Sequence, residues 1–229
     1  RLPFVSLCHS REGGNPGMTS GLVFFIIFML SSTAFDGFRG TIKWMDMFFV
    51  FIQALGPTGG LYAPQIIETL GLIASLIIFW LVYMVFVFLM KVSIRAKQSV
   101  SELGKDFIFS LLQIALVYNV AHYYTLFINQ GQSIIKIISD PFGYGWNLFG
   151  TAQIPSNPGL LDMNFVWHSQ VALILFGHVV AVIVAHIISL HVFPSHKKAV
   201  ISQFPMLLLM VLFTMTGLWI LSQPLGVGL

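Results

Sequence analysis

Residues 165–193 constrain the fold of this chain more than any other stretch. Their sequence, FVWHSQVALILFGHVVAVIVAHIISLHVF, has four histidines and contains no Asp, Glu, Lys or Arg. An α-helix rises about 1.5 Å per residue and crosses the hydrocarbon core of a bilayer with about 20 mainly apolar residues. Histidines are rare in lipid unless they face protein, water, a metal or a cofactor. We therefore predict a membrane-spanning helix whose polar stripe faces the interior of a helix bundle.

Helical periodicity places three of these histidines on one side of the helix. At about 100° per residue, His186 returns to the azimuth of His168 after five turns, and His178 lies within about 80° of both. His191 falls off this stripe and, with His196, is expected at the cytoplasmic end. The stripe is therefore predicted to consist of His168, His178 and His186.

The composition of the whole chain indicates an all-α polytopic transmembrane helix bundle of about five to six spans. Hydrophobic residues make up 57% and charged residues only 8%, whereas about a quarter of the residues in a soluble domain are charged. The polar segments between the apolar runs are too short to bury a core of their own. The net charge of +3 is assigned to loop topology, and no nucleic-acid partner is expected. The single cysteine, Cys8, excludes a disulfide framework and a thiolate metal site.

The spans are clear except near the N-terminus. Residues 21–55 contain two short apolar runs, 21–30 and 45–55, which are separated by charged and glycine-rich sequence. We favour two abbreviated spans here over one span followed by a re-entrant segment, which would need protein or water around its broken backbone. Four further spans are predicted at residues 66–92, 105–130, 165–193 and 200–221.

Basic residues predict the orientation of the bundle. They gather in the connections at 91–105 and 196–198, which lie two crossings apart and so share one face. The positive-inside rule assigns that face to the cytoplasm. The Gly- and Pro-rich segment 131–164 is then an extracytoplasmic loop of a single domain, 18–229, and loops of this length are usually functional. Residues 1–17 are polar and rich in turn formers, which predicts a disordered or non-native tail.

A second polar stripe follows His122 on the span 105–130, where Tyr118, Asn119 and Asn129 lie on the same side. Counting helix rises places His122 between His168 and His178 in depth. These three imidazoles are therefore expected to converge in the outer half of the membrane, with carboxylates from loops. The candidate metal ligands are His122, His168, His178 and His186; the candidate carboxylates are Asp36, Asp140 and Asp162.

Three interpretations of the histidines remain open. Neutral imidazoles suit a zinc, copper or iron site with an open position for water or substrate. One histidine from each of two helices would suit haem b. Each histidine could instead form a hydrogen bond across a helix interface, as polar groups in membrane bundles commonly do. The spacings match no established metal motif such as HExxH.

Five segments of the chain resemble, in the same order, segments of a family of bacterial polytopic membrane proteins known as fenitrothion hydrolase. The resemblance implies a place in the bacterial inner (cytoplasmic) membrane and hydrolysis of an organophosphorus ester by a membrane-bound, two-component system. The segments are SSTAFDGF (31–38), AHYYTLFINQGQ (121–132), SDPFGYGWNLFGTA (139–152), WHSQVALILFGHV (167–179) and QFPMLLLMVLFTMTGLWIL (203–221).

The family pattern implies that the chain has part of the site common to the family, and that a further part of the protein is supplied by another chain. The resemblance implies that the chain corresponds to the C-terminal part of such proteins. It has His-Ile-Ile at 186–188, where the family pattern leads us to expect an acidic and a basic residue. A second membrane subunit is therefore expected beside the lipid bilayer as a partner. The residues that match the pattern are His122, Gln130, Gln132, Asp140, Trp146, Trp167 and His178.

The leading expectation is an integral membrane subunit of a hetero-oligomeric complex with a histidine-based metal site near its outer face. If the chain is an enzyme, the expected reaction is metal-dependent hydrolysis. His122 and His178 would bind the metal, and Asp36 or Asp140 would orient a histidine or accept a proton. The alternatives are a cytochrome b-like electron-transfer anchor and a non-catalytic structural or assembly subunit.

Overall fold

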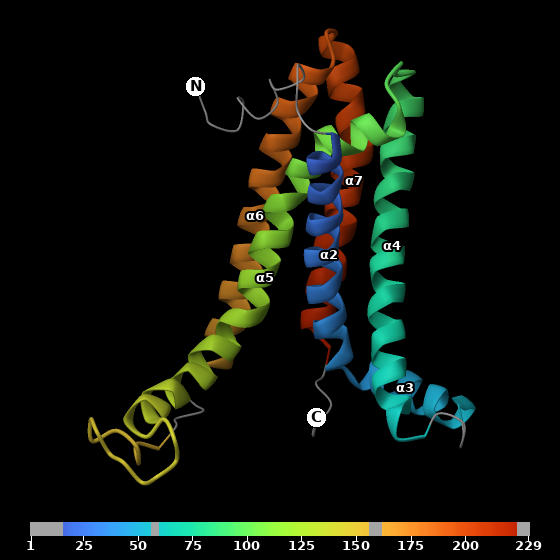
Figure 1. The fold of residues 1–229 in the computed structure, drawn as a ribbon. Coiled ribbons are helices and arrows are strands. Elements are labelled where there is room, and N and C mark those ends of the chain that lie inside the picture. The colour runs from blue at the N-terminus through green and yellow to red at the C-terminus, as the bar shows by residue number, and fades with distance from the viewer. Residues whose placement is uncertain (1–15, 56–59, 156–161, 224–229) are drawn as a thin grey trace.

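The computed structural model describes residues 16–55, 60–155 and 162–223, and in these ranges it contains α-helices and no β-strand (Figure 1). The all-α fold is therefore confirmed. The predicted tail at 1–17 lies almost entirely outside the described residues, since the first helix begins at Pro16. The helices are α2 (Pro16–Arg39), α3 (Ile42–Leu55), α4 (Ala63–Ile94), α5 (Val100–Ser139), α6 (Met163–Val192) and α7 (His196–Leu221).

Five of these helices, α2, α4, α5, α6 and α7, are long and apolar enough to cross a membrane, as in a multi-pass membrane protein. The remaining helix, α3, has 14 residues, about 21 Å of helix against about 30 Å of hydrocarbon. The prediction of two abbreviated spans in 21–55 is therefore wrong. One span, α2, is followed by a short helix that lies across the end of the bundle (Figure 1).

The helix α2 passes through the charged and glycine-rich sequence that was predicted to be a connection. Arg39 of α2 pairs with Glu68 of α4 at 3.2 Å and with Asp36 at 3.6 Å. The chain turns only at Gly40, after which the hydroxyl of Thr41 accepts the backbone N–H of Trp44 at 3.3 Å and starts α3. The ion pairs with α4 thus allow charged residues to remain within the last turns of a spanning helix.

The helix α5 is longer at both ends than predicted. It starts with a capping box in which Ser99 and Glu102 each bond to the backbone N–H of the other, at 3.1 and 2.9 Å. It continues to Ser139, so the first nine residues of the predicted loop 131–164 are helical. The non-helical segment that the structure describes here is 140–155, and it follows the C-terminal end of α5 (Figure 1).

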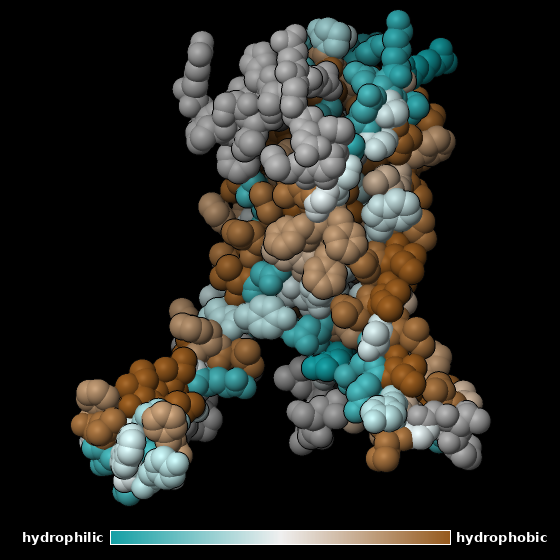
Figure 2. Space-filling model, in the orientation of Figure 1, coloured by the Kyte–Doolittle hydropathy of each residue, from teal (hydrophilic) through white to brown (hydrophobic). Residues whose placement is uncertain are grey.

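The five spanning helices form a ring. The contacts run from α2 to α5, then to α6, α7, α4 and back to α2. Small residues permit the closest approach, since a Cβ added to Gly177 of α6 would lie 2.8 Å from Val117 of α5. Large side chains such as Tyr83 and Phe107 are fully buried inside the ring. The outer faces of the helices carry exposed apolar residues that suit contact with lipid (Figure 2).

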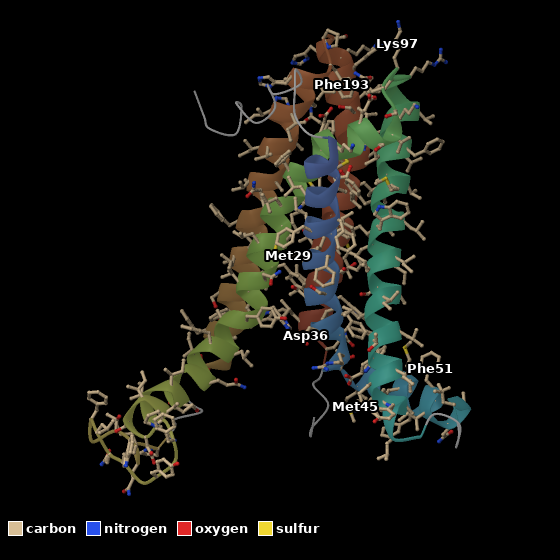
Figure 3. All side chains as sticks on the ribbon, in the orientation of Figure 1. Met29, Asp36, Met45, Phe51, Lys97 and Phe193 are labelled. Atoms are coloured by element: carbon tan, nitrogen blue, oxygen red, sulfur yellow. The ribbon has the colours of Figure 1, made fainter. Side chains whose placement is uncertain are left out.

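The two ends of the bundle differ in charge. Figure 1 places the α4–α5 and α6–α7 connections at the same end, as predicted from the basic residues. We call it the basic end, and Figure 3 marks it with Lys97 and Phe193. At the opposite end, the last part of α5 and the first part of α6 diverge from the other helices and form one arm. The start of α4 and α3 form a second arm, and Figure 2 shows a notch between the two.

Candidate functional site

Asp36 is the centre of a polar cluster at the end opposite the basic end (Figure 3). Its Oδ2 atom lies 3.2 Å from Nε2 of His122 and accepts the hydroxyl of Tyr123 at 3.0 Å. The side chains of Asp36 and His122 are 38% and 18% exposed. The cluster is therefore half-buried between α2 and α5, with access from the surface.

The carboxylate of Asp36 determines which ring nitrogen of His122 carries the proton. Because Asp36 accepts at Nε2, that nitrogen carries the proton in the neutral ring, and Nδ1 is left as the basic nitrogen. Nδ1 has no hydrogen-bond partner among the described residues. A carboxylate in this position fixes the ring orientation and the tautomer of a histidine. His122 is thus oriented for use as a base or as a ligand.

Gly37 makes room for the histidine ring. A Cβ at this position would lie 2.9 Å from Cγ2 of Ile220 and 3.2 Å from Cε1 of His122. Contacts below 3.0 Å are not tolerated without a shift of the neighbouring atoms. The glycine that follows Asp36 therefore allows α2, α5 and α7 to meet around His122.

Charged residues extend the cluster toward α4. Arg39 lies between the carboxylates of Asp36 and Glu68, and its side chain is 44% exposed. Exposed ion pairs of this kind each contribute about 0–1 kcal/mol. We read Arg39 and Glu68 as groups that hold the end of α2 against α4, and so position Asp36.

Two of the predicted stripe histidines form hydrogen bonds between α6 and α7. His178 Nδ1 lies 3.1 Å from the hydroxyl of Thr214. His186 Nδ1 lies 2.9 Å from Oε1 of Gln203, whose amide nitrogen donates to Ser189 at 2.8 Å. This is the geometry of the third interpretation of the histidines, in which they join neighbouring helices.

The other histidines of α6 bond to their own helix. His168 Nδ1 lies 2.7 Å from the carbonyl of Asn164, and His191 Nδ1 lies 2.8 Å from the carbonyl of Ile187. Both side chains are exposed. The prediction that the stripe faces the interior of the bundle is therefore wrong for His168, and also for His186, whose side chain is exposed as well.

The predicted convergence of His122, His168 and His178 is not found. In the part of the chain that the structure describes, no three His, Cys, Asp or Glu side chains come together so as to hold a metal ion. A site with three protein ligands, as catalytic zinc requires, does not fit these residues alone. The spacing of residues in the sequence gives the side of the helix and the depth at which each histidine lies. It does not tell which neighbouring helix that side contacts.

The candidate carboxylates of the loop have structural partners. Asp140 accepts the backbone N–H groups of Tyr144 and Gly145, at 3.0 and 2.9 Å, and so shapes the loop. Asp162 is the N-cap of α6 and accepts the N–H of Asn164 at 3.3 Å. Figures 1 and 3 place the Asp140 loop at the tip of α5, well away from Asp36. Of the three candidate carboxylates, Asp36 alone lies beside a histidine.

The other residues of the resemblance are spread over the arm formed by α5 and α6. Trp146 packs with the rings of Phe142 and Tyr144 at 5.8 and 5.7 Å in the loop. Gln130 and Trp167 are exposed on α5 and α6. The amide nitrogen of Gln132 lies 3.5 Å from the carbonyl of Ile128 in its own helix. The structure does not bring this set together with His122 in one pocket.

The sequence did not predict the hydrogen-bond partners of His178 and His186. Thr214 and Gln203 are among the few polar residues of α7 after its first turn, which was the available signal. Gln170 was also missed; it donates to the carbonyl of Ala121 at 2.9 Å and joins α6 to α5. These polar contacts fix the register of the bundle rather than form a reaction centre.

Comparison of the chain with models of protein families, with curated proteins and with solved structures gave no match.

Proposed function

We propose that this chain is an integral membrane subunit of a hetero-oligomeric complex and contributes an acid–base pair, Asp36 and His122, to a site at the extracytoplasmic end. The observation that carries this proposal is the Asp36 carboxylate, which lies 3.2 Å from His122 Nε2 and 3.0 Å from the Tyr123 hydroxyl, while Nδ1 has no hydrogen-bond partner in the part of the chain that the structure describes. Ionisable groups inside or at the edge of a membrane bundle are costly, and they usually mark functional sites.

The orientation follows from the charges of the connections. Lys91, Arg95 and Lys97 lie at one connection of the basic end, and Lys197 and Lys198 lie at the other. Positive charge is retained on the cytoplasmic side. The Asp36–His122 pair then faces the extracytoplasmic side of a bacterial inner membrane.

The chemistry we propose is general base catalysis of hydrolysis, in line with the family resemblance of five ordered segments. His122 Nδ1 takes a proton from water as the water oxygen forms a bond to phosphorus and the aryloxide leaves. Asp36 stabilises the imidazolium that results. A correctly placed general base contributes about 10²- to 10⁴-fold to the rate. Any metal at the site would need further ligands from the partner subunit.

The notch supports a partner subunit. Polar side chains such as His168 and Gln130 are exposed on the arm of α5 and α6, and polar groups facing lipid are unfavourable unless they meet protein or water. Asp36 lies near the point where α2 and α5 diverge (Figure 3). A helix of a second membrane protein in the notch would cover these groups and complete the site.

The test uses the complex purified from native membranes in mild detergent. Its hydrolysis of a nitrophenyl phosphotriester is followed by release of nitrophenolate. We expect His122→Gln to lower the rate at least 100-fold, while His191→Gln, which changes a histidine bonded only to its own helix, leaves the rate unchanged. A wild-type complex without hydrolysis, or full activity in His122→Gln, would refute the proposal.

A second candidate, a non-catalytic assembly subunit, is favoured by the hydrogen bonds His178–Thr214 and His186–Gln203 between α6 and α7. Such bonds in membrane bundles stabilise helix packing by about 0.6 kcal/mol on average. In this case, His122→Gln would weaken association with the partner but the intact complex would have no hydrolytic activity. Size-exclusion chromatography of the variant complex separates the two candidates.

A further inference from the structure

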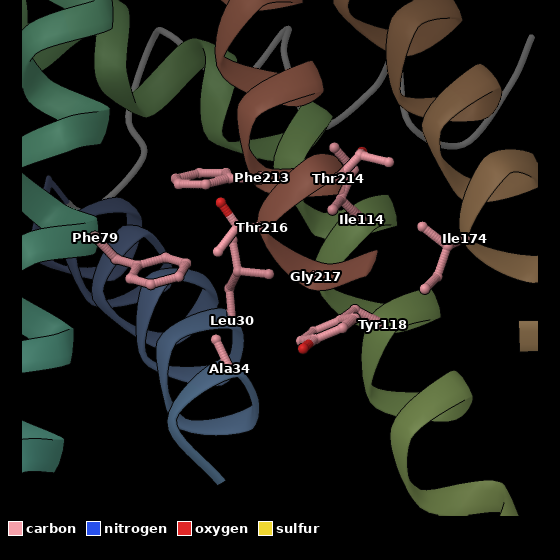
Figure 4. A pocket seen from close by; sticks show the side chains of 10 residues that line it. All are labelled: Leu30, Ala34, Phe79, Ile114, Tyr118, Ile174, Phe213, Thr214, Thr216 and Gly217. Atoms are coloured by element: carbon pink, nitrogen blue, oxygen red, sulfur yellow. The ribbon is translucent and has the colours of Figure 1, made fainter. Parts of the chain in front are cut away.

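A small cavity lies where all five spanning helices meet (Figure 4). It offers about 10 Å³ to the centre of a water molecule, which is the space that one water needs. A haem could not enter it. Its lining residues are Leu30 and Ala34 of α2, Phe79 of α4, Ile114 and Tyr118 of α5, Ile174 of α6, and Phe213, Thr214, Thr216 and Gly217 of α7.

The hydroxyl of Tyr118 is buried at this cavity without a partner. The residue is 4% exposed, and its hydroxyl oxygen forms no hydrogen bond with any described residue. It is the one buried side-chain oxygen or nitrogen of the described residues in that condition. Figure 4 shows its ring reaching from α5 with the hydroxyl directed toward Leu30 and Ala34. An unsatisfied buried hydroxyl costs about 1–3 kcal/mol, so most such groups in proteins have a partner.

We propose that the cavity holds one ordered water molecule, to which the Tyr118 hydroxyl is bound. A buried water typically forms two to four hydrogen bonds. Two threonines, Thr214 and Thr216, are among the residues that line the same cavity. The hydroxyl of Thr216 donates to the carbonyl of Leu212, so its lone pairs can still accept a hydrogen bond. This inference does not rest on the proposed function.

The water lies between two polar pairs of the bundle, His178–Thr214 and Asp36–His122. Thr214 is already the partner of His178 of α6. Tyr118 lies one turn from His122 on α5, with 6.4 Å between the two ring centres. A water between α5 and α7 therefore lies between the half-buried His178–Thr214 pair and the Asp36–His122 pair nearer the surface. The water would link helices that otherwise contact each other through apolar side chains at this depth.

Radiolytic labelling of the full chain in detergent or nanodiscs tests this directly. Brief X-ray exposure generates hydroxyl radicals from ordered water inside the protein, and mass spectrometry locates the modified residue. We expect Tyr118 to be modified. Tyr83 is the matched control, because it is fully buried and its hydroxyl bonds to the carbonyl of Gly104 at 2.5 Å. Tyr118 as unreactive as Tyr83 would show a dry cavity and overturn the proposal.

Thermal unfolding of the variant Tyr118→Phe is a second test, because a water-filled cavity and a dry cavity predict different changes in the midpoint. If the hydroxyl binds water, its removal lowers the midpoint of thermal unfolding, as Tyr83→Phe should also do. If the cavity is dry, removal of an unsatisfied hydroxyl leaves the midpoint unchanged or raises it, which contradicts the proposal. The labelling of the wild-type chain decides the matter even if the variant fails to fold.

Discussion

The Nε2 atom of His122 lies 3.2 Å from Oδ2 of Asp36, although the two residues are 86 positions apart in the sequence. Tyr123 donates to the same oxygen at 3.0 Å. Two residues of α5 therefore hold one carboxylate of α2. The contact exists because α2 stays helical through Asp36 and because Gly37 has no side chain where His122 packs.

We expect Gly37→Ala to destabilise the protein. The new methyl group would lie 2.9 Å from Ile220 and 3.2 Å from His122, and overpacking of this kind costs about 1–3 kcal/mol. Thermal unfolding in detergent measures the effect. Gly21→Ala on the same helix is the control, since its added Cβ meets nothing within 4 Å; we expect that change to be neutral or mildly stabilising. Equal midpoints for the two variants would contradict the packing described for Gly37.

We expect His186→Ala to weaken the packing of α6 on α7. The change removes the bond to Gln203 at 2.9 Å, and interhelical hydrogen bonds in membrane bundles are worth about 0.6 kcal/mol on average and up to about 1.7 kcal/mol. His191→Ala removes only a contact with its own backbone and should have a smaller effect. Unfolding by denaturant of both variants, side by side, gives the difference. A larger loss in His191→Ala would be inconsistent with this interface.

We expect Gly177→Ala to disturb the contact of α6 with α5. The added Cβ would lie 2.8 Å from both Cβ and Cγ2 of Val117, so the helices must separate or the valine must move. A cost of about 1–3 kcal/mol follows if the packing cannot relax. The matched change is Gly131→Ala on α5, where the added group meets no atom within 4 Å. If Gly177→Ala unfolds at the same temperature as the wild type, these helices are not in close contact there.

Cysteine labelling tests the topology. In a chain whose Cys8 is replaced by serine, we expect Gly40→Cys and Tyr62→Cys to react with a membrane-impermeant reagent from one side, and Lys97→Cys from the other. One span followed by a helix across its end places residues 40 and 62 on the same side. Two abbreviated spans would place them on opposite sides, and such a result would overturn the fold of the first part of the chain.

Hydropathy predicted the spans from α4 onward, because each is a long apolar run that no soluble fold could bury. It failed at residues 21–55, where Asp36, Arg39 and two glycines suggested a connection. The structure retains these charges in the helix since Arg39 lies between Asp36 and Glu68. A pairing with a residue 29 positions away leaves no local pattern in the sequence.

The candidate site was predicted in part. Asp36 and His122 were both identified as candidates, and Asp36 or Asp140 was expected to orient one of the histidines, but which carboxylate meets which histidine was left open. Their pairing depends on which helices are neighbours, and periodicity does not contain that information. The same limit explains why His168 and His178 were expected to converge with His122, whereas His178 meets Thr214 of α7 and His168 bonds to its own helix.

The most direct test of the Asp36–His122 pair is a double-mutant cycle on the hydrolytic rate of the native complex. We expect Asp36→Asn and His122→Gln each to lower the rate about 10²- to 10⁴-fold, and the double variant to lose no more than the more damaged single variant, because residues that act as a unit are not additive. Asp46→Asn, the same chemical change at an exposed residue of α3, should leave the rate unchanged. Independent, additive losses, or a rate in Asp36→Asn equal to that of Asp46→Asn, would contradict the account.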